Sequence, residues 1–183
     1  MKKLIASASM VALLCVGARA SAEIYDNQPF FGGARVGYGR LSGDDGESVG
    51  ALSLQGKIGV HTPCSPRHYL CAIGGYASAQ GLFSEIAELP LLLLATGSIG
   101  GELFFQNGSL YAGLGGSQLR LDSLDVADGL MAELGADIRL GGPVGIGVQW
   151  QHFDLMTNAI YYESAVSEEL NVDAFNVTFN VMW

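Results

Sequence analysis

The chain has 183 residues, of which 49% are apolar and only 15% are charged, and its formal net charge is −9. An acidic chain lacks the excess of lysine and arginine that binds nucleic acid, so we expect no nucleic-acid partner. Typical soluble domains carry about 25% charged residues, and this chain is therefore unusually apolar for a soluble protein.

The first 22 residues have the pattern of a secretory signal peptide. Lys2 and Lys3 precede an apolar stretch over residues 4–17, and Ala20-Ser21-Ala22 has the form of a cleavage motif. This apolar stretch is shorter than the roughly 20 residues that a membrane-spanning helix needs. We therefore expect residues 1–22 to be removed and residues 23–183 to form one domain with a net charge of −12.

The rest of the chain alternates between apolar and polar residues in short segments, which is the pattern of β-strands. After the signal peptide the longest apolar run covers residues 89–95, and it is interrupted by Pro90. The predicted strands cover residues 28–40, 51–61, 70–82, 91–105, 110–121, 130–140, 144–151 and 173–183. The third of these is rich in Gly and Ala, and its facing stays open.

Residues 130–140 show the alternation most clearly inside the chain. One face is entirely apolar, whereas the other contains Glu133, Asp137 and Arg139. The residues of the apolar face are Leu130, Ala132, Leu134, Ala136, Ile138 and Leu140. An exported chain with such strands and no spanning helix has one main way to cross a membrane, a closed β-barrel.

The connections alternate in length, as they do in outer-membrane barrels. If the N-terminus begins in the periplasm, the extracellular loops cover residues 41–50, 82–90, 122–129 and 155–171, and the periplasmic turns cover residues 62–69, 106–109 and 141–143. The prediction is an all-β protein, an eight-stranded antiparallel up-and-down transmembrane β-barrel.

The chain ends on a strictly alternating strand whose last residue is aromatic. The predicted lipid-facing row is Phe175, Val177, Phe179, Val181 and Trp183. With polar Asn176, this end resembles the signal that the barrel-assembly machinery recognises. Together with the signal peptide and the eight segments, it makes the mature chain similar to the small eight-stranded outer-membrane barrels, the group of the OmpA transmembrane domain, OmpX and the opacity proteins. The resemblance implies an outer-membrane location in a Gram-negative bacterium, with lipid and lipopolysaccharide as surroundings, and it implies little about function.

Six charged residues have the parity that faces the barrel interior. They are Arg35, Lys57, Glu102, Glu133, Asp137 and Arg139. An eight-stranded barrel is just wide enough for side chains to fill, and a buried charge is costly unless it is paired. We expect these residues to form an ion-pair network that plugs the lumen, and a narrow channel for small solutes is the alternative.

Cysteine usage agrees with export. Cys15 leaves with the signal peptide, and the remaining pair, Cys64 and Cys71, is expected to form a disulfide across the first periplasmic turn. His61 and His68 lie nearby, but their spacing matches no zinc pattern. We expect no metal and no cofactor.

The predicted loops are acidic. Their carboxylates belong to Asp44, Asp45, Glu47, Glu85, Glu88, Asp122, Asp125, Asp128, Glu163, Glu168 and Glu169. They keep the loops solvated, and they could also contact an unidentified surface partner or share divalent ions with lipopolysaccharide phosphates.

His152 directly follows the predicted strand 144–151 and continues its lipid-facing parity, with Asp154 two residues on. A lipid A deacylase of the small-barrel type would need a serine beside it, and the nearest one downstream is Ser164. We predict no catalytic residues. The function expected from the sequence is a non-enzymatic surface barrel for envelope integrity or loop-mediated contact, with a lipid A-modifying enzyme as the alternative.

Overall fold

The computed structural model describes residues 29–43, 46, 48–64, 71–84, 92–105, 107–121, 124–157, 160–161, 164–165 and 169–183. In this part of the chain every regular element is a β-strand. No helix in these ranges is long and apolar enough to cross a membrane. The predicted signal peptide lies outside the described residues, so the domain boundary at residue 23 stays a prediction.

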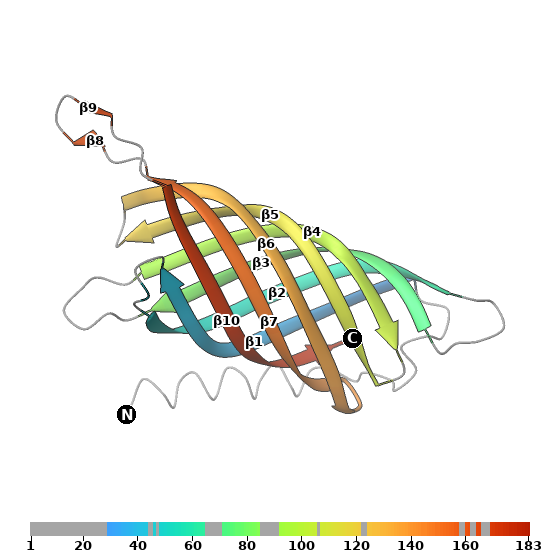
Figure 1. Cartoon of the computed structure of the whole chain (residues 1–183). Helices are drawn as coiled ribbons and strands as arrows, with labels where there is room; N and C mark the ends of the chain where they lie inside the picture. Colours follow the sequence, from blue (N-terminus) through green and yellow to red (C-terminus); the bar gives the residue numbers. More distant parts are fainter. Residues whose placement is uncertain are drawn as a thin grey trace.

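Eight long strands form one closed antiparallel barrel, which confirms the predicted fold (Figure 1). The strands are β1 (Phe30–Gly43), β2 (Ser48–Pro63), β3 (Cys71–Ser84), β4 (Leu92–Phe105), β5 (Gly108–Leu121), β6 (Leu124–Gly141), β7 (Val144–Thr157), β8 (Ile160–Tyr161), β9 (Ser164–Ala165) and β10 (Glu169–Met182). The order around the barrel is β1-β10-β7-β6-β5-β4-β3-β2, and β8 and β9 form a separate hairpin that projects from one end.

The barrel closes where the first long strand meets the last. β1 pairs with β10 from Gly33 opposite Met182 to Gly43 opposite Val172. Closure leaves no strand edge with unpaired backbone groups, which is the condition for a β-structure to cross a membrane.

The two ends of the barrel differ. We call the end that carries the connections after β1, β3, β5 and β7 the loop end, and the end that carries those after β2, β4 and β6 the turn end. Two turn-end connections are tight, as predicted, with Asn107 between β4 and β5 and Gly142 after β6. Gly142 has a φ of 57°, the left-handed conformation that favours glycine.

The barrel wall is one sheet thick, so side chains point alternately to the outside and into the lumen. In β2, Leu52, Leu54 and Ile58 are exposed, whereas Ser53 and Lys57 are buried, as predicted. The structure also resolves the third strand, whose facing the sequence left open. In β3 the even-numbered residues point inward, and they include buried Ala72, Tyr76, Gln80, Leu82 and Ser84.

The strands extend into all four predicted loops, and the largest single shift of a boundary is at the third. The third loop was expected over residues 122–129, but β6 already begins at Leu124, because Leu121 pairs with Leu124 in a tight hairpin. Asp125 and Asp128 therefore lie in a strand and not in a loop. The fourth connection begins only after Thr157 and contains the β8–β9 hairpin.

The strand register supports the predicted disulfide. The last pair between β2 and β3 is Pro63 opposite Ala72, so one further step along the ladder would set Cys64 opposite Cys71, and the disulfide itself stays a prediction. Residues that oppose each other in an antiparallel pair have Cα atoms about 4.5 to 5.5 Å apart, the separation that a disulfide spans.

We predict that intact-mass analysis of the secreted protein will show Cys64 and Cys71 joined. Closing this eight-residue ring should stabilise the fold by about 2.5 kcal/mol in the chain-entropy estimate. Free thiols on both residues, detected by alkylation before reduction, would contradict the pairing. A Cys64→Ser/Cys71→Ser variant should fold with a lower unfolding midpoint.

Candidate functional site

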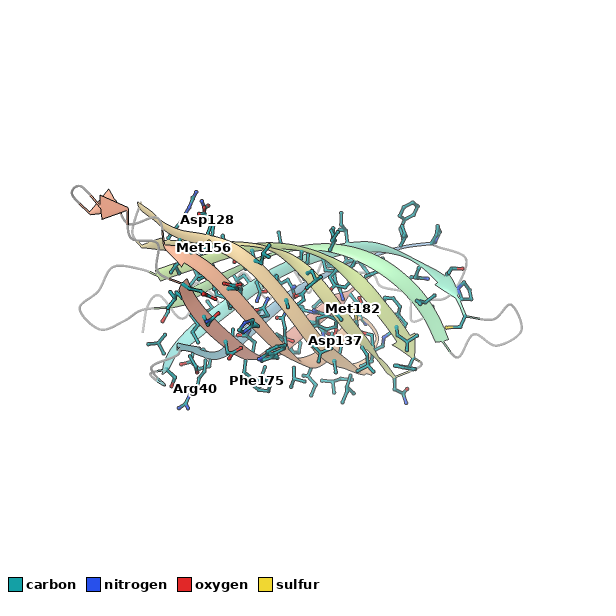
Figure 2. The ribbon with its side chains drawn as sticks, turned by 45° about the horizontal axis from the view of Figure 1, so that its top comes forward. Arg40, Asp128, Asp137, Met156, Phe175 and Met182 are labelled. Atoms are coloured by element: carbon teal, nitrogen blue, oxygen red, sulfur yellow. The ribbon has the colours of Figure 1, made fainter. Side chains whose placement is uncertain are left out.

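Large apolar side chains cover the outside of the barrel. Among the described residues, 37% to 72% of the surface of each of these side chains is exposed (Figure 2). They are Phe30, Tyr38, Leu52, Leu54, Ile58, Val60, Ile73, Ile99, Phe105, Leu110, Leu114, Leu130, Leu134, Ile138, Leu140, Ile146, Val148, Trp150, Met156, Phe175, Val177, Phe179 and Trp183. In water such a surface would drive aggregation, and it is the surface that a bilayer requires.

The apolar band has the height of an outer-membrane barrel. On β10 and its C-terminal end the outward row runs from Glu169 to Trp183, and its last charged residue is Asp173, ten residues before Trp183. Ten residues rise about 33 Å along a strand, and a strand tilt of about 40° reduces this to about 25 Å along the barrel axis. The span from Asp173 to Trp183 therefore matches the height of the apolar band of an outer-membrane barrel.

Four of the five residues of the predicted C-terminal row are exposed on the outer face, and Val181, on the same face, is the exception with 9% exposure. Its neighbours in the ladders are Ala34 and Val144, and the larger residues Phe179 and Trp183 flank it along the chain. We attribute its burial to these larger neighbours on the same face.

Trp183 is fixed against the start of β1. Its backbone N–H donates to Gly32 O and its carbonyl accepts from Gly32 N–H, both at 2.9 Å. Its ring lies over Gly32, where an added Cβ would come within 2.7 Å of the indole Nε1. The terminal residue therefore contributes to closing the barrel.

Inside the lumen, four of the six predicted charged residues form two ion pairs. Arg35 pairs with Asp137, and Lys57 pairs with Glu102. All four side chains are at most 2% exposed. Tyr111 lies beneath both cations, with its ring centre 4.3 Å from Arg35 Cζ and 4.6 Å from Lys57 Nζ.

Neutral side chains join the two ion pairs into one network. The Ser109 hydroxyl lies 2.6 Å from Glu102 Oε1 and 3.5 Å from Asp137 Oδ2. Asn180 Nδ2 donates to Asp137 Oδ1 at 2.8 Å. Buried charges are tolerated when their remaining hydrogen-bonding capacity is satisfied in this way.

The fifth charged residue, Glu133, is held by neutral donors. Its Oε1 accepts from the Tyr76 hydroxyl at 2.7 Å and from Ser98 at 2.5 Å. Its Oε2 accepts from Gln149 at 2.8 Å and more weakly from Gln55 at 3.5 Å. Gln55 also accepts from Arg35 at 3.1 Å, which connects Glu133 to the ion pairs.

Arg139 differs from the other five. It has the inward parity, but it is only half-buried and lies two residues before the turn at Gly141. The contacts described above join two bases and three acids, and the membership of Arg139 in a balanced network of three bases and three acids stays a prediction. Its position near the barrel mouth explains its greater exposure.

Clusters of buried, mainly apolar side chains lie toward both ends of the lumen. At the loop end a cluster of buried residues contains Leu41, Ala51, Leu82, Leu94, Ala127, Met131, Phe153, Leu155 and Ala174. At the turn end a second cluster contains Phe31, Ala72, Tyr76, Phe104 and Tyr111. We call them the loop-end cluster and the turn-end cluster. Between them the polar network occupies the middle of the barrel.

On the outer wall, His152 forms a pair that sequence analysis did not predict. Its Nδ1 lies 3.0 Å from Asp173 Oδ1, and its ring stacks on Trp150 with ring centres 6.1 Å apart. Asp173 is 21 residues away in sequence and is brought opposite His152 by the β7–β10 ladder. On the other side of Asp173, β1 places Ser42.

The order of Ser42, Asp173 and His152 across three adjacent strands decides whether they could act together as a serine hydrolase site. Ser42, Asp173 and His152 follow one another on adjacent strands, so the acid lies between the serine and the histidine. Strands lie about 4.8 Å apart, so Ser42 and His152 are separated by roughly 10 Å at the backbone. In a serine hydrolase the histidine must contact the serine directly, and this order does not provide that contact.

The described residues contain no group of three or more His, Cys, Asp or Glu side chains that could hold a metal ion. The acidic residues of the predicted loops lie largely outside the described ranges. Among the described residues, the largest group of polar side chains in contact with one another lies inside the lumen.

No protein-family model matches the chain, and no curated protein matches it in sequence. Among solved structures, the outer membrane enzyme PagL superposes with a TM-score of 0.50 at 11% identity, over 82% of this chain and 98% of PagL. Neisserial surface protein A gives a TM-score of 0.47 at 13% identity, over 84% of this chain and 97% of its own. Ail, the attachment invasion locus protein of Yersinia pestis, gives a TM-score of 0.45 at 13% identity, over 85% of this chain and 100% of Ail.

At these identities the similarity concerns the fold. A closed eight-stranded barrel with an apolar outer wall and a polar interior is the architecture of the small outer-membrane β-barrels, as the sequence resemblance predicted. Proteins of this class reside in the outer membrane of Gram-negative bacteria, which is the location expected from the sequence.

Proposed function

We propose that the protein is a non-enzymatic surface barrel of the outer membrane with a closed lumen, which acts through envelope integrity or through contacts of its loops. The observation that carries this proposal is the filled interior. The polar network occupies the middle of the barrel, and an apolar cluster lies at each end. A solute or ion would have to displace buried side chains at three levels to pass.

The interactions of such a protein would lie at the loop end. The β8–β9 hairpin projects beyond the barrel there (Figure 1), and the predicted loops are acidic. We propose that these loops meet lipopolysaccharide through divalent ions, or an unidentified surface partner. We also propose that the barrel-assembly machinery recognises the C-terminal row that ends at Trp183.

Of the two alternatives, only the enzyme has a specific observation in its favour. The His152–Asp173 pair on the outer wall is a candidate for lipid A chemistry, because a carboxylate orients the histidine ring. The row places no serine next to His152, which disfavours hydrolysis through a serine nucleophile. A narrow channel would need the ion pairs to rearrange and both end clusters to open.

One pair of measurements on the mature barrel tests the proposal. In a planar bilayer we expect no steady conductance from the wild type, because side chains fill the lumen. In cells we expect His152→Ala to leave the acylation pattern of lipid A unchanged, as judged by mass spectrometry. Steady conductance would favour the channel, and a lipid A profile that depends on His152 would favour the enzyme.

A further inference from the structure

A single glycine separates two polar side chains in the middle of the lumen. Asp137 of β6, Gly147 of β7 and Thr178 of β10 stand directly opposite one another on adjacent strands, and all three have the inward parity. An added Cβ at Gly147 would contact Asp137 Oδ1 and would lie 2.9 Å from Thr178 Oγ1. Both oxygens therefore lie close above this glycine.

Two oxygen atoms near the Asp137 carboxylate, one beside Gly147 and the other beside Gly145, are buried without a hydrogen-bond partner among the described residues. They are Thr178 Oγ1 and Asn180 Oδ1, and their residues are 2% and 0% exposed. The amide nitrogen of Asn180 donates to Asp137 Oδ1 at 2.8 Å, which holds the carboxamide next to the same carboxylate. A buried polar atom without a partner is costly, so native structures pair such atoms with protein groups or with ordered water.

The chemistry of the three oxygens favours water over a metal ion. The other oxygen of the Asp137 carboxylate already pairs with the Arg35 guanidinium, so a second cation would face a like charge. A water molecule offers two donors and accepts hydrogen bonds, and buried waters typically make about three hydrogen bonds. Asp137 and Asn180 supply two acceptors, and the Thr178 hydroxyl supplies one donor.

We propose that an internal water molecule is bound beside the Asp137 carboxylate, donating to Asp137 Oδ1 and Asn180 Oδ1 and accepting from the Thr178 hydroxyl. The water completes the hydrogen bonds of the Arg35–Asp137 ion pair and of the two unpartnered oxygens. Because the loop-end and turn-end clusters lie on either side of the polar network, this water exchanges slowly with bulk solvent.

Thr178→Val and Thr178→Ser are the matched variants that test the site. Valine keeps the shape of threonine but removes the hydroxyl, whereas serine keeps the hydroxyl and removes a methyl group. If the hydroxyl holds a water, Thr178→Val should lower the folding equilibrium constant roughly 5- to 150-fold. Thr178→Ser should lower it less. Urea unfolding of the barrel refolded in detergent measures both constants.

The second measurement does not depend on the variants folding. In the wild-type barrel in deuterated detergent, NMR should show a magnetisation transfer from water to the Gly147 amide proton, and Thr178→Val should abolish it. A Thr178→Val barrel at least as stable as Thr178→Ser, or a wild type without this transfer, overturns the proposal. A bound water that exchanges fast would support the site and contradict only the closed lumen.

Discussion

Glu102→Ala is expected to destabilise the folded barrel by about 3 to 5 kcal/mol, the cost of leaving one member of a buried ion pair without its partner. The side chain of Lys57 is only 2% exposed, and Glu102 is its paired carboxylate. The rings of Tyr76 and Tyr111 lie 4.9 and 4.6 Å from Lys57 Nζ and can offset only part of the loss. Urea unfolding of the refolded barrel in lipid vesicles measures the change.

Two further variants show whether the lost energy is that of an unpaired charge. Lys57→Met combined with Glu102→Leu removes both charges while keeping volume, and it should be close to the wild type in stability or above it. Glu169→Ala removes an exposed acid at the start of β10 and should change stability by less than about 0.5 kcal/mol. A Glu102→Ala barrel that loses less than about 1 kcal/mol would contradict a buried, unsolvated pair.

Deleting Phe179–Trp183 is expected to prevent assembly in the outer membrane while leaving export to the periplasm intact. The deletion removes four of the pairs that join β10 to β1, from Phe179 opposite Val36 to Met182 opposite Gly33. It also removes both hydrogen bonds between Trp183 and Gly32. The open seam would expose unpaired backbone groups to lipid, where each costs several kcal/mol.

The assay is fractionation of cells that express the full-length precursor, with the outer-membrane and periplasmic amounts compared by immunoblot. Trp183→Phe is the matched control, since it keeps the strand and a terminal aromatic ring and should assemble close to the wild-type level. Normal amounts of the deletion variant in the outer membrane would contradict both the seam argument and the predicted assembly signal.

Which side chains of a strand point to the outside and which point into the lumen could be predicted, because this depends only on local parity. In residues 130–140 every second side chain is apolar, and a strand sends successive side chains to opposite faces. The same rule assigned Arg35, Lys57, Glu102, Glu133 and Asp137 to the interior, where all five are buried. The rule did not decide which residues of β3 face inward, because with Gly and Ala on both faces the two faces differ too little in polarity.

Pairing could not be predicted, because parity gives the face of a residue and not its height or its neighbour across the barrel. Arg35 and Asp137 are 102 residues apart, and their contact depends on the register of every ladder between β1 and β6. Closure of β1 on β10 likewise placed Asp173 between Ser42 and His152. The sequence thus determined the strands, their faces and the barrel class, since these follow from a local period of two. Only the tertiary structure decided which charges pair, which side chains fill the lumen and where Thr178 faces Asp137 over Gly147, since these depend on register and closure.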